Sequence, residues 1–277
     1  MSDARTVRLG LTYCGNAENP LLPPLATSDD RGRVSESTDE EALPIAEDEL
    51  MAKVTVVLLE AALELIPEQI AGHPQVVRTA RRYGLRPGEM LLDAGIHWKA
   101  MRSLEAWWRR GRPDIVHLSL LNLLEKAPVR EGLAEVFVHL QDGRVIAFSP
   151  GVRLPKNYDR FKGLMAQVLR VGRAPPEGEP LVWTAAKDLR GFLGNRGLIL
   201  LSEDAEVEER PADIVREAYE TGSAIGFGAF PRGPFSKDVL SLATKRVRIR
   251  GGEPLKAWDV ACALSCALYD LAERLKG

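Results

Sequence analysis

The chain contains only three cysteines among its 277 residues, and one of them, Cys14, lies in the first 50 residues. So few cysteines cannot build a disulfide framework, and they suit a reducing compartment. The other two, Cys262 and Cys266, lie four residues apart in an apolar segment, where cysteines commonly serve as small packing residues. The four histidines are scattered along the chain. We therefore expect no metal site.

Long apolar runs are absent as well. No segment approaches the roughly 18 consecutive apolar residues of a membrane-spanning helix. The N-terminus lacks the basic and then apolar pattern of a signal peptide. We therefore expect a cytoplasmic protein without a membrane partner. Because 45% of the residues are hydrophobic, the chain can bury one large core, or one core with a smaller attachment.

The chain has little net charge, with a formal value of −2 at pH 7. Its overall charge therefore does not indicate a nucleic-acid partner. The charges are unevenly distributed, because residues 1–50 hold 11 acidic and 4 basic residues, whereas residues 51–277 hold 28 acidic and 33 basic ones. Residues 1–50 are also rich in Pro and Ser. We predict an acidic, disordered tail over 1–50 and a folded, mildly basic domain over 51–277.

Strand and helix patterns alternate along the folded part. Hydrophobic periodicity and Pro or Gly boundaries predict a buried strand near 54–59, helices over 74–83, 98–110, 115–124 and 213–220, and short strands at 90–95, 181–185 and 197–201. They also predict a helix that carries Phe161, Leu164, Met165 and Val168. Trp107 and Trp108 are expected to pack in the core or at an interface rather than to stack on bases. The alternation from Leu181 to the end predicts a parallel α/β sheet.

Residues 134–160 combine a hairpin pattern with a basic loop. Two alternating apolar runs flank Asp142-Gly143, which predicts a β-hairpin with a type I′ turn. Arg153, Lys156 and Arg160 then follow three and four residues apart at the entrance of a helix. Such a cluster of cations can clamp phosphate groups. A solvated basic face is the alternative, and these residues alone leave the choice open.

The stretch from Ser223 to Leu271 organises the rest of the chain. It predicts two buried strands, each followed by a glycine-rich loop, and then a long amphipathic helix. Such loops bind small ligands in α/β folds, because glycine lets the backbone approach closely. Tight turns alone are the alternative reading. The dinucleotide fingerprint fails, because Pro231 occupies the place of its third glycine. A nucleotide-dependent oxidoreductase is therefore disfavoured.

Five segments carry a resemblance to a known family. VTVVLLEAALELIP, RPDIVHLSLLNLLEKAP, VRLPKNYDRFKGLM, GAFPRG and EPLKAW occur in the order seen in the Nep/Emg family. From about Lys53 to its end, the chain resembles the archaeal-type members of this family. They are small-subunit ribosomal RNA pseudouridine N1-methyltransferases of the SPOUT class. Residues 1–50 lie outside the resemblance.

The resemblance implies a fold and an assembly. The fold is an α/β sheet in which residues of about 197–277 thread a loop to form a deep trefoil knot, a known exception among folds. A small β-hairpin-containing extension is implied around residues 133–160. Members are cytoplasmic homodimers with a role in ribosome biogenesis. Contacts with other ribosome assembly factors are left open.

The resemblance also implies a cofactor and a substrate, S-adenosylmethionine and small-subunit (16S-type) rRNA. The implied RNA-binding residues are Arg112, Asp114, Arg153, Lys156 and Arg160. The implied cofactor-binding residues are Leu201, Ser202, Gly228, Ala229, Phe230, Gly233, Ile249, Arg250, Gly251, Gly252, Glu253, Pro254 and Leu255. The RGGEPL loop is one residue longer than the family's usual loop. Lys156 replaces an arginine found in many relatives, so it lacks the bidentate fork of a guanidinium.

Arg112 and Asp114 are the candidate catalytic residues. Methyl transfer to N1 of a pseudouridine requires that N1 lose its proton. We expect Arg112 to stabilise the charge that develops on the neighbouring carbonyl oxygens, and Asp114 to orient Arg112. Asp114 as a general base is the alternative. A second alternative for the whole protein is an RNA-binding assembly factor with little catalytic role, because the same residues would serve both functions.

Overall fold

The computed structural model describes residues 53–251 and 254–276. The tail predicted over 1–50 lies outside the described residues, as do Gly252 and Glu253 of the proposed cofactor loop.

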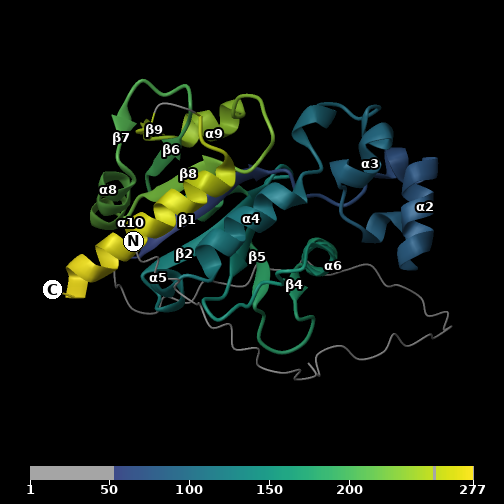
Figure 1. The fold of residues 1–277 in the computed structure, drawn as a ribbon, viewed down its shortest axis with the longest axis horizontal. Helices are drawn as coiled ribbons and strands as arrows, with labels where there is room; N and C mark the ends of the chain where they lie inside the picture. Colours follow the sequence, from purple (N-terminus) through teal and green to yellow (C-terminus); the bar gives the residue numbers. More distant parts are fainter. Residues whose placement is uncertain (1–52, 252–253, 277) are drawn as a thin grey trace, which may run out of the picture. The chain divides into compact units, whose positions relative to one another are not determined.

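One mixed sheet organises the described chain (Figure 1). Its strand order is β4-β5-β3-β2-β1-β8-β6-β9-β7. The strands are β1 (Val54–Ala61), β2 (Ala134–Leu140), β3 (Val145–Phe148), β4 (Arg173–Ala174), β5 (Val182–Ala186), β6 (Leu198–Leu201), β7 (Glu208–Glu209), β8 (Ala224–Gly228) and β9 (Lys245–Ile249). All eight residues of β1 are buried, as expected for a central strand covered on both faces.

The sheet is parallel on one side and antiparallel on the other. Strands β2, β1, β8, β6, β9 and β7 pair in parallel. The pairs β2–β3, β3–β5 and β4–β5 are antiparallel. The predicted parallel sheet is therefore confirmed for β6, β8 and β9 and wrong for β5. That strand follows β4 through a short Pro-rich connector, and no crossover helix separates the two strands.

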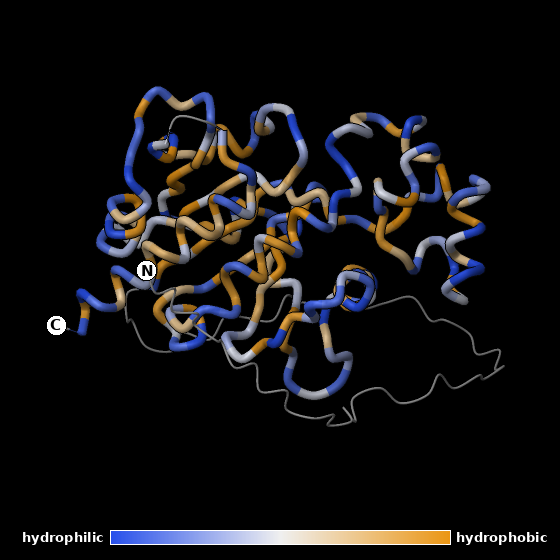
Figure 2. Tube along the Cα trace, viewed as in Figure 1, coloured by the Kyte–Doolittle hydropathy of each residue, from blue (hydrophilic) through white to orange (hydrophobic). Residues whose placement is uncertain are grey.

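Helices cover both faces of the sheet. Alternate residues of β1 point to opposite faces, so Val56 and Leu58 pack with α4 (Pro113–Leu124), α6 (Tyr158–Val171), α8 (Pro211–Thr221) and α10 (Ala257–Lys276). Val57 and Leu59 pack instead with α7 (Leu189–Leu193) and α9 (Lys237–Leu242). α5 (Ala127–Arg130) precedes β2. Figure 2 shows the hydrophobic residues concentrated along the strands between these layers.

A smaller lobe follows β1 and has its own apolar cluster. It contains α1 (Glu68–Ala71), α2 (Pro74–Tyr83), η1 (Pro87–Glu89), α3 (Ala94–Met101) and η2 (Trp107–Arg109). The prediction that α2 begins at Pro74 and stops before Gly84 is confirmed, since Gly84 takes a left-handed conformation with φ 64°. No helix in the described ranges is long and apolar enough to cross a membrane.

Two local predictions in this lobe are wrong. Residues 90–95 form no strand, because Leu91 makes only an isolated bridge to Leu65. The helix predicted over 98–110 ends at Met101. Ala106 takes a left-handed φ of 47° and is the N-cap of the short 3₁₀ turn that begins at Trp107.

The hairpin is confirmed, but its turn type is wrong. Leu140 and Arg144 are joined by a backbone hydrogen bond of 2.8 Å across a three-residue loop. Among the described loop residues, only Gly143 has a positive φ (97°), whereas a type I′ turn needs two such residues.

The expected burial of Cys262 and Cys266 is also wrong. Both are exposed, because they lie on the side of α10 opposite Ala261, Leu264 and Leu268, which face the core.

Candidate functional site

A cleft of about 800 Å³ lies at the carboxyl ends of three neighbouring parallel strands, β8, β6 and β9. Residues that follow each strand form its walls, and Arg112 and Ile115 at the start of α4 close one side. This position agrees with the general rule for ligand sites in α/β sheets. The sequence pattern of glycine-rich loops after buried strands therefore predicted the place of the main cleft.

Most of the predicted cofactor residues meet in this cleft. Those that line it are Leu201, Ser202, Gly228, Phe230, Gly233, Ile249, Pro254 and Leu255. Ala229 is fully buried instead, and its backbone pairs with Leu59 and Ala62 through bonds of 2.9 Å. Arg250 and Gly251 are not among the lining residues.

Sequence reasoning missed several other lining residues, among them Glu203, Asp204, Phe235 and Trp258. The acidic pair follows directly after Ser202, and Trp258 lies three residues beyond Leu255. Their position next to predicted residues was the available signal. The hydroxyl of Ser202, followed by the guanidinium of Arg246, lowers the pKa of Asp204. The mouth of the cleft therefore carries a carboxylate that stays ionised at neutral pH.

Gly228 is required by close packing at the end of β8. A Cβ added there would lie 2.9 Å from Cε1 of Phe230 and 3.2 Å from Cζ of Phe235. These two rings pack edge to face with centroids 5.3 Å apart. An aromatic wall and a nearby carboxylate fit S-adenosylmethionine, which combines a flat adenine with polar and cationic groups.

Arg112 and Asp114 form a bidentate ion pair at the edge of the cleft. The Nε and Nη2 atoms of Arg112 donate to the two carboxylate oxygens of Asp114 at 2.8 and 2.7 Å. The backbone N–H of Arg112 donates to the carbonyl of Ala62 after β1 (2.9 Å), which fixes the start of α4. These hydrogen bonds to Asp114 raise the pKa of Arg112 above its ordinary value. Both side chains remain about one-third exposed, at 34% and 36%, so both can contact a substrate.

The predicted RNA loop packs against the same helix. His117 on α4 donates from Nε2 to the carbonyl of Pro155 (2.7 Å), since a carbonyl can only accept. Its ring stacks on Phe161 with centroids 4.3 Å apart. Asn157 caps α6 by accepting from the backbone N–H of Arg160 (3.0 Å). His117 is therefore a buried packing residue, and its bond to Pro155 fixes the basic loop.

The three loop cations remain exposed on this support. Lys156 lies 3.8 Å from Glu125, while Arg153 and Arg160 make no ion pair within the described ranges. Tyr158, two residues after Lys156, donates its hydroxyl to Asp93 (3.2 Å), and burial followed by the carboxylates of Asp93 and Asp114 raises its pKa. The structure therefore brings the basic loop and the start of α4 to adjoining positions.

Asp93 is a buried carboxylate that sequence reasoning missed. It accepts from Lys162 Nζ at 2.8 Å and from the Tyr158 hydroxyl at 3.2 Å, and it caps α3 through Gly95 (2.9 Å). It therefore joins the small lobe to α6. Tyr158 and Lys162 lie 65 and 69 residues further along the chain, and no local pattern indicates these two partners.

A second cavity of about 320 Å³ adjoins the cleft and shares Arg112, Pro231 and Arg232 with it. Trp107 and Trp108 line this cavity together with Trp98. Trp98 and Trp108 are 47% and 46% exposed. Trp108 therefore does not pack in the core, and its expected place at an interface stays a prediction.

The described ranges contain no group of three or more His, Cys, Asp or Glu residues placed to hold a metal ion. The fold and the site together define an α/β protein that holds a small ligand where parallel strands end, beside a cationic loop suited to a polyanion.

Comparison with known proteins identifies the family. The EMG1/NEP1 methyltransferase model matches residues 56–269. The chain is 42% identical over 222 residues to the "Ribosomal RNA small subunit methyltransferase Nep1" of Aeropyrum pernix, covering 80% of this chain and 97% of that protein. It is 43% identical over 209 residues to the protein of the same name from Staphylothermus marinus, covering 74% and 90%. The chain belongs to the EMG1/NEP1 methyltransferase family, so the resemblance seen in its motifs is confirmed.

A solved structure is similar as well. It is the crystal structure of Archaeoglobus fulgidus Nep1 bound to S-adenosylhomocysteine, with a TM-score of 0.71 and 34% sequence identity. The match covers 80% of this chain and 99% of that one. The mixed α/β fold is therefore shared with a relative that binds S-adenosylhomocysteine, the compound left when S-adenosylmethionine has given up its methyl group.

Proposed function

We propose that this chain is an S-adenosylmethionine-dependent methyltransferase that modifies small-subunit ribosomal RNA at N1 of a pseudouridine. The observation that carries the proposal is the cleft at the ends of β8, β6 and β9, in a family whose Archaeoglobus member binds S-adenosylhomocysteine. The names of the Aeropyrum and Staphylothermus relatives support the RNA substrate. The acceptor atom follows from the motif resemblance.

The walls of the cleft would hold the cofactor. When bound, S-adenosylmethionine supplies a methyl group on a positively charged sulfur. The residues proposed to hold it are those of the three strand-end loops, including Gly252 and Glu253, which lie outside the described ranges. Gly228 keeps the aromatic wall in place, and Asp204 supplies a negative charge that favours a cationic ligand.

Arg112 and Asp114 are proposed to act on the acceptor base. An N1–H group is a poor nucleophile, and it improves as negative charge develops on the ring. A guanidinium beside the ring carbonyls would stabilise that charge in the transition state. Asp114 holds two of the three guanidinium nitrogens of Arg112, so it sets the direction of the third, Nη1. This geometry favours the orienting role of Asp114 over the role of general base.

The basic loop is proposed to bind the RNA backbone. Arg153 and Arg160 are exposed cations on a segment fixed by His117 and Asn157, and phosphate contacts from such residues position a nucleic acid. Lys156 would add a point charge without a fork. Flipping the acceptor base out of an RNA loop would expose N1, as in other enzymes that act on bases.

Finer features of the assembly belong to the same proposal. We propose one methyltransferase domain over 51–277, with an extension around 133–160 and a trefoil knot within about 197–277. The position of β6 between β8 and β9 in the sheet is compatible with the knot. We also propose a homodimer, as the motif resemblance implies. Cytoplasmic location stays a prediction.

The decisive experiment uses labelled S-adenosylmethionine and two small-subunit RNA transcripts that differ only in one uridine or pseudouridine. We expect methyl incorporation only with pseudouridine. Incorporation into both transcripts would reject N1 of pseudouridine as the acceptor. Tight RNA binding without incorporation into either would favour the assembly-factor alternative, because the two functions share the same RNA-binding residues.

A further inference from the structure

Glu60 lies at the carboxyl end of β1 in an unusual backbone conformation. Its φ is 49°, in the left-handed region that a residue with a side chain seldom adopts. The pairing of β1 with β2 shifts register between Leu58 and Ala61. Such bulges commonly re-aim a side chain beside a functional site. The backbone of β1 is thus distorted at Glu60, and its side chain need not follow the regular alternation of the strand.

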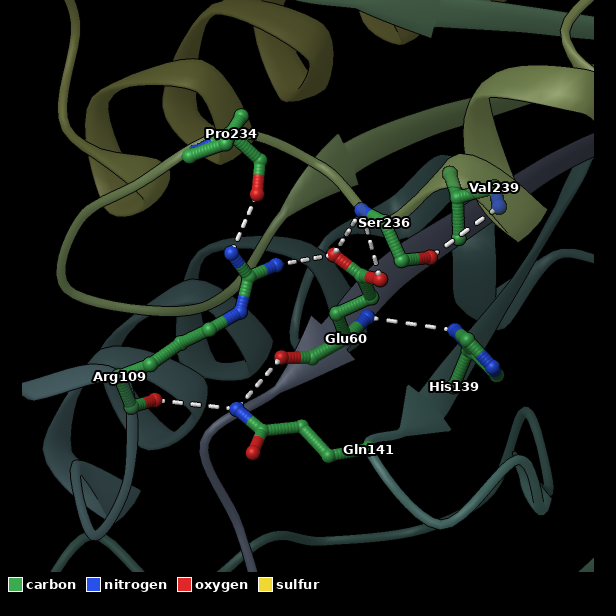
Figure 3. A network of polar contacts seen from close by, with 7 residues as sticks. All are labelled: Glu60, Arg109, His139, Gln141, Pro234, Ser236 and Val239. Carbon is green, nitrogen blue, oxygen red and sulfur yellow. Dashed lines mark hydrogen bonds and ion pairs between the residues drawn. The ribbon is translucent and has the colours of Figure 1, made fainter. Parts of the chain in front are cut away.

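The carboxylate of Glu60 is directed at the loop that follows β8 (Figure 3). It accepts a hydrogen bond of 3.1 Å from the backbone N–H of Ser236. It also forms an ion pair with Arg109, whose side chain is 18% exposed, while that of Glu60 is 8% exposed. A charge pair this sheltered from water is screened little by salt.

Arg109 contacts the same loop at two further points. One guanidinium nitrogen donates to the carbonyl of Pro234. The guanidinium carbon lies 3.8 Å from the centroid of the Phe230 ring, a stacking contact between a cation and an aromatic face. Residues 230–236 are therefore held by a backbone donor, a backbone acceptor and a side chain at once.

The other end of this network is anchored to the sheet. The backbone N–H of Glu60 donates to Nδ1 of His139 on β2 (3.2 Å). Gln141 donates from Nε2 to the backbone carbonyls of Glu60 (3.4 Å) and Arg109 (3.0 Å). The network around Glu60 and Arg109 therefore connects the centre of the sheet to a loop that lines the cleft through Phe230, Gly233 and Phe235.

We propose that the Glu60–Arg109 ion pair is a positioning device that holds residues 230–236 in the conformation that binds the cofactor. The inference rests on the proposed function, because it assigns these residues to the same cleft. A loop fixed before binding loses less conformational entropy when the ligand arrives, so its affinity for the ligand is higher. Neither side chain needs to touch the cofactor for this effect.

A neighbouring ion pair provides a matched control. Arg110 donates to both carboxylate oxygens of Glu64 at 2.8 and 2.5 Å. The exposed fractions of these two side chains are 21% and 24%. The hydrogen-bond acceptors of Arg110 in the described ranges are Glu64 and the backbone carbonyl of Glu105, which lie outside the loop 230–236. Arg110 lines the second cavity together with Pro231 and Arg232, but breaking this pair removes a mostly buried ion pair without removing a hydrogen bond to the loop.

The test is calorimetric titration of S-adenosylhomocysteine into wild-type protein, Arg109→Met, Arg109→Lys, Glu60→Gln, Arg110→Met and Glu64→Gln. Loss of a charge-assisted bond corresponds to about a tenfold change in affinity, so Arg109→Met should weaken binding about tenfold. Arg109→Lys should retain part of the affinity, since it keeps the charge. Glu60→Gln should also retain part, because its amide oxygen can accept from Ser236.

The controls separate positioning from stability. We expect Arg110→Met and Glu64→Gln to lower the melting temperature about as much as Arg109→Met and Glu60→Gln do. They should change the affinity for S-adenosylhomocysteine less than about twofold. An affinity of Arg109→Met within twofold of wild type would overturn the inference, as would an equal loss in Arg110→Met. Should Arg109→Met fail to fold, Arg109→Lys and Glu60→Gln decide by the same criterion.

Amide hydrogen exchange without ligand keeps the two proposals distinguishable. The inference expects faster exchange at Ser236 in Arg109→Met than in Arg110→Met, and equal rates would overturn it. A wild-type protein that does not bind S-adenosylhomocysteine would instead reject the proposed function, whatever the exchange rates are.

Discussion

The guanidinium of Arg112 donates two hydrogen bonds, of 2.8 and 2.7 Å, to the carboxylate of Asp114 two residues further along the chain. Pro113 separates them at the first position of α4. Proline fixes φ there, so the two side chains leave the helix start on one side. The pair lies where the cleft, the second cavity and the basic loop adjoin, and its geometry determines which guanidinium nitrogens remain available to a substrate.

Substitutions of this pair test the assigned roles. Arg112→Ala should lower kcat by a factor of about 10² to 10³, as expected when one transition-state donor is removed. Arg112→Lys should recover little, because an ammonium cannot hold Asp114 and the base together. Single-turnover methylation with saturating RNA measures the effect, and the melting temperature serves as the control for an intact fold.

Asp114→Asn distinguishes the orienting role from general base catalysis. If Asp114 orients Arg112, the variant keeps one acceptor and should lose about tenfold in rate, with the pH–rate profile unchanged in shape. If Asp114 is the base, the variant loses the group whose ionisation sets the acidic limb, and that limb disappears. A missing limb would therefore reject the orienting role.

The basic loop is tested by salt dependence. Arg153→Ala and Arg160→Ala should each reduce the slope of log affinity against log salt by about 0.7 to 0.9, the contribution of one phosphate contact. Lys156→Arg should tighten binding, because a guanidinium supplies the missing fork. Arg190→Ala on α7, which packs on the other face of the sheet, is the control and should leave the slope unchanged. An unaltered slope in the Arg153 and Arg160 variants would reject the clamp.

Two glycines of β8 separate stability from cofactor binding. A Cβ at Gly226 would lie 2.5 Å from Cδ1 of Leu59, inside the core, so Gly226→Ala should lower the free energy of unfolding by about 1–3 kcal/mol. A Cβ at Gly228 would instead displace Phe230 and Phe235. Gly228→Ala should therefore weaken S-adenosylhomocysteine binding more than it lowers stability. Urea unfolding and calorimetry on both variants check this contrast.

The sequence allowed prediction of those parts of the fold that depend on local pattern. The apolar run after Lys53, the helix entered at Pro113 and the periodicity from Ala257 each specify burial within one element. The turn at Ala106 was not predictable, because nothing about an alanine favours a left-handed conformation. The exposure of Cys262 depends on which face of α10 the other helices leave uncovered.

The same division holds for the site. The glycine-rich loops after β8 and β9 were visible in the sequence, because glycine marks close approach of the backbone. Glu60 was not, since it is a single acidic residue in an apolar run and its partner Arg109 lies 49 residues away. The role proposed for Glu60 depends on the folded chain, which brings the bulge in β1 next to the loop after β8.

Buried histidines predict how stability depends on pH. Burial lowers the pKa of His97, His117 and His139 below the ordinary value of 6.5. Below about pH 6.5 the unfolded chain therefore binds more protons than the folded one. The stabilisation is fully present above that pH, and it is lost as the pH falls toward the folded-state pKa values. Each histidine can contribute a slope of at most about 1.4 kcal/mol per pH unit.

His117→Gln isolates one of these contributions. Glutamine can still donate to the carbonyl of Pro155 but does not titrate, so the free energy of unfolding should fall less steeply between pH 7 and pH 5 than in wild type. Ser119→Ala is the matched control, since Ser119 is equally buried on α4 and bonds to Ile115 at 2.8 Å. Its loss should lower stability by the same amount at every pH. Urea titrations at pH 7, 6 and 5 measure both slopes, and a wild-type slope in His117→Gln would show that the buried ring of His117 does not drive the loss of stability in acid.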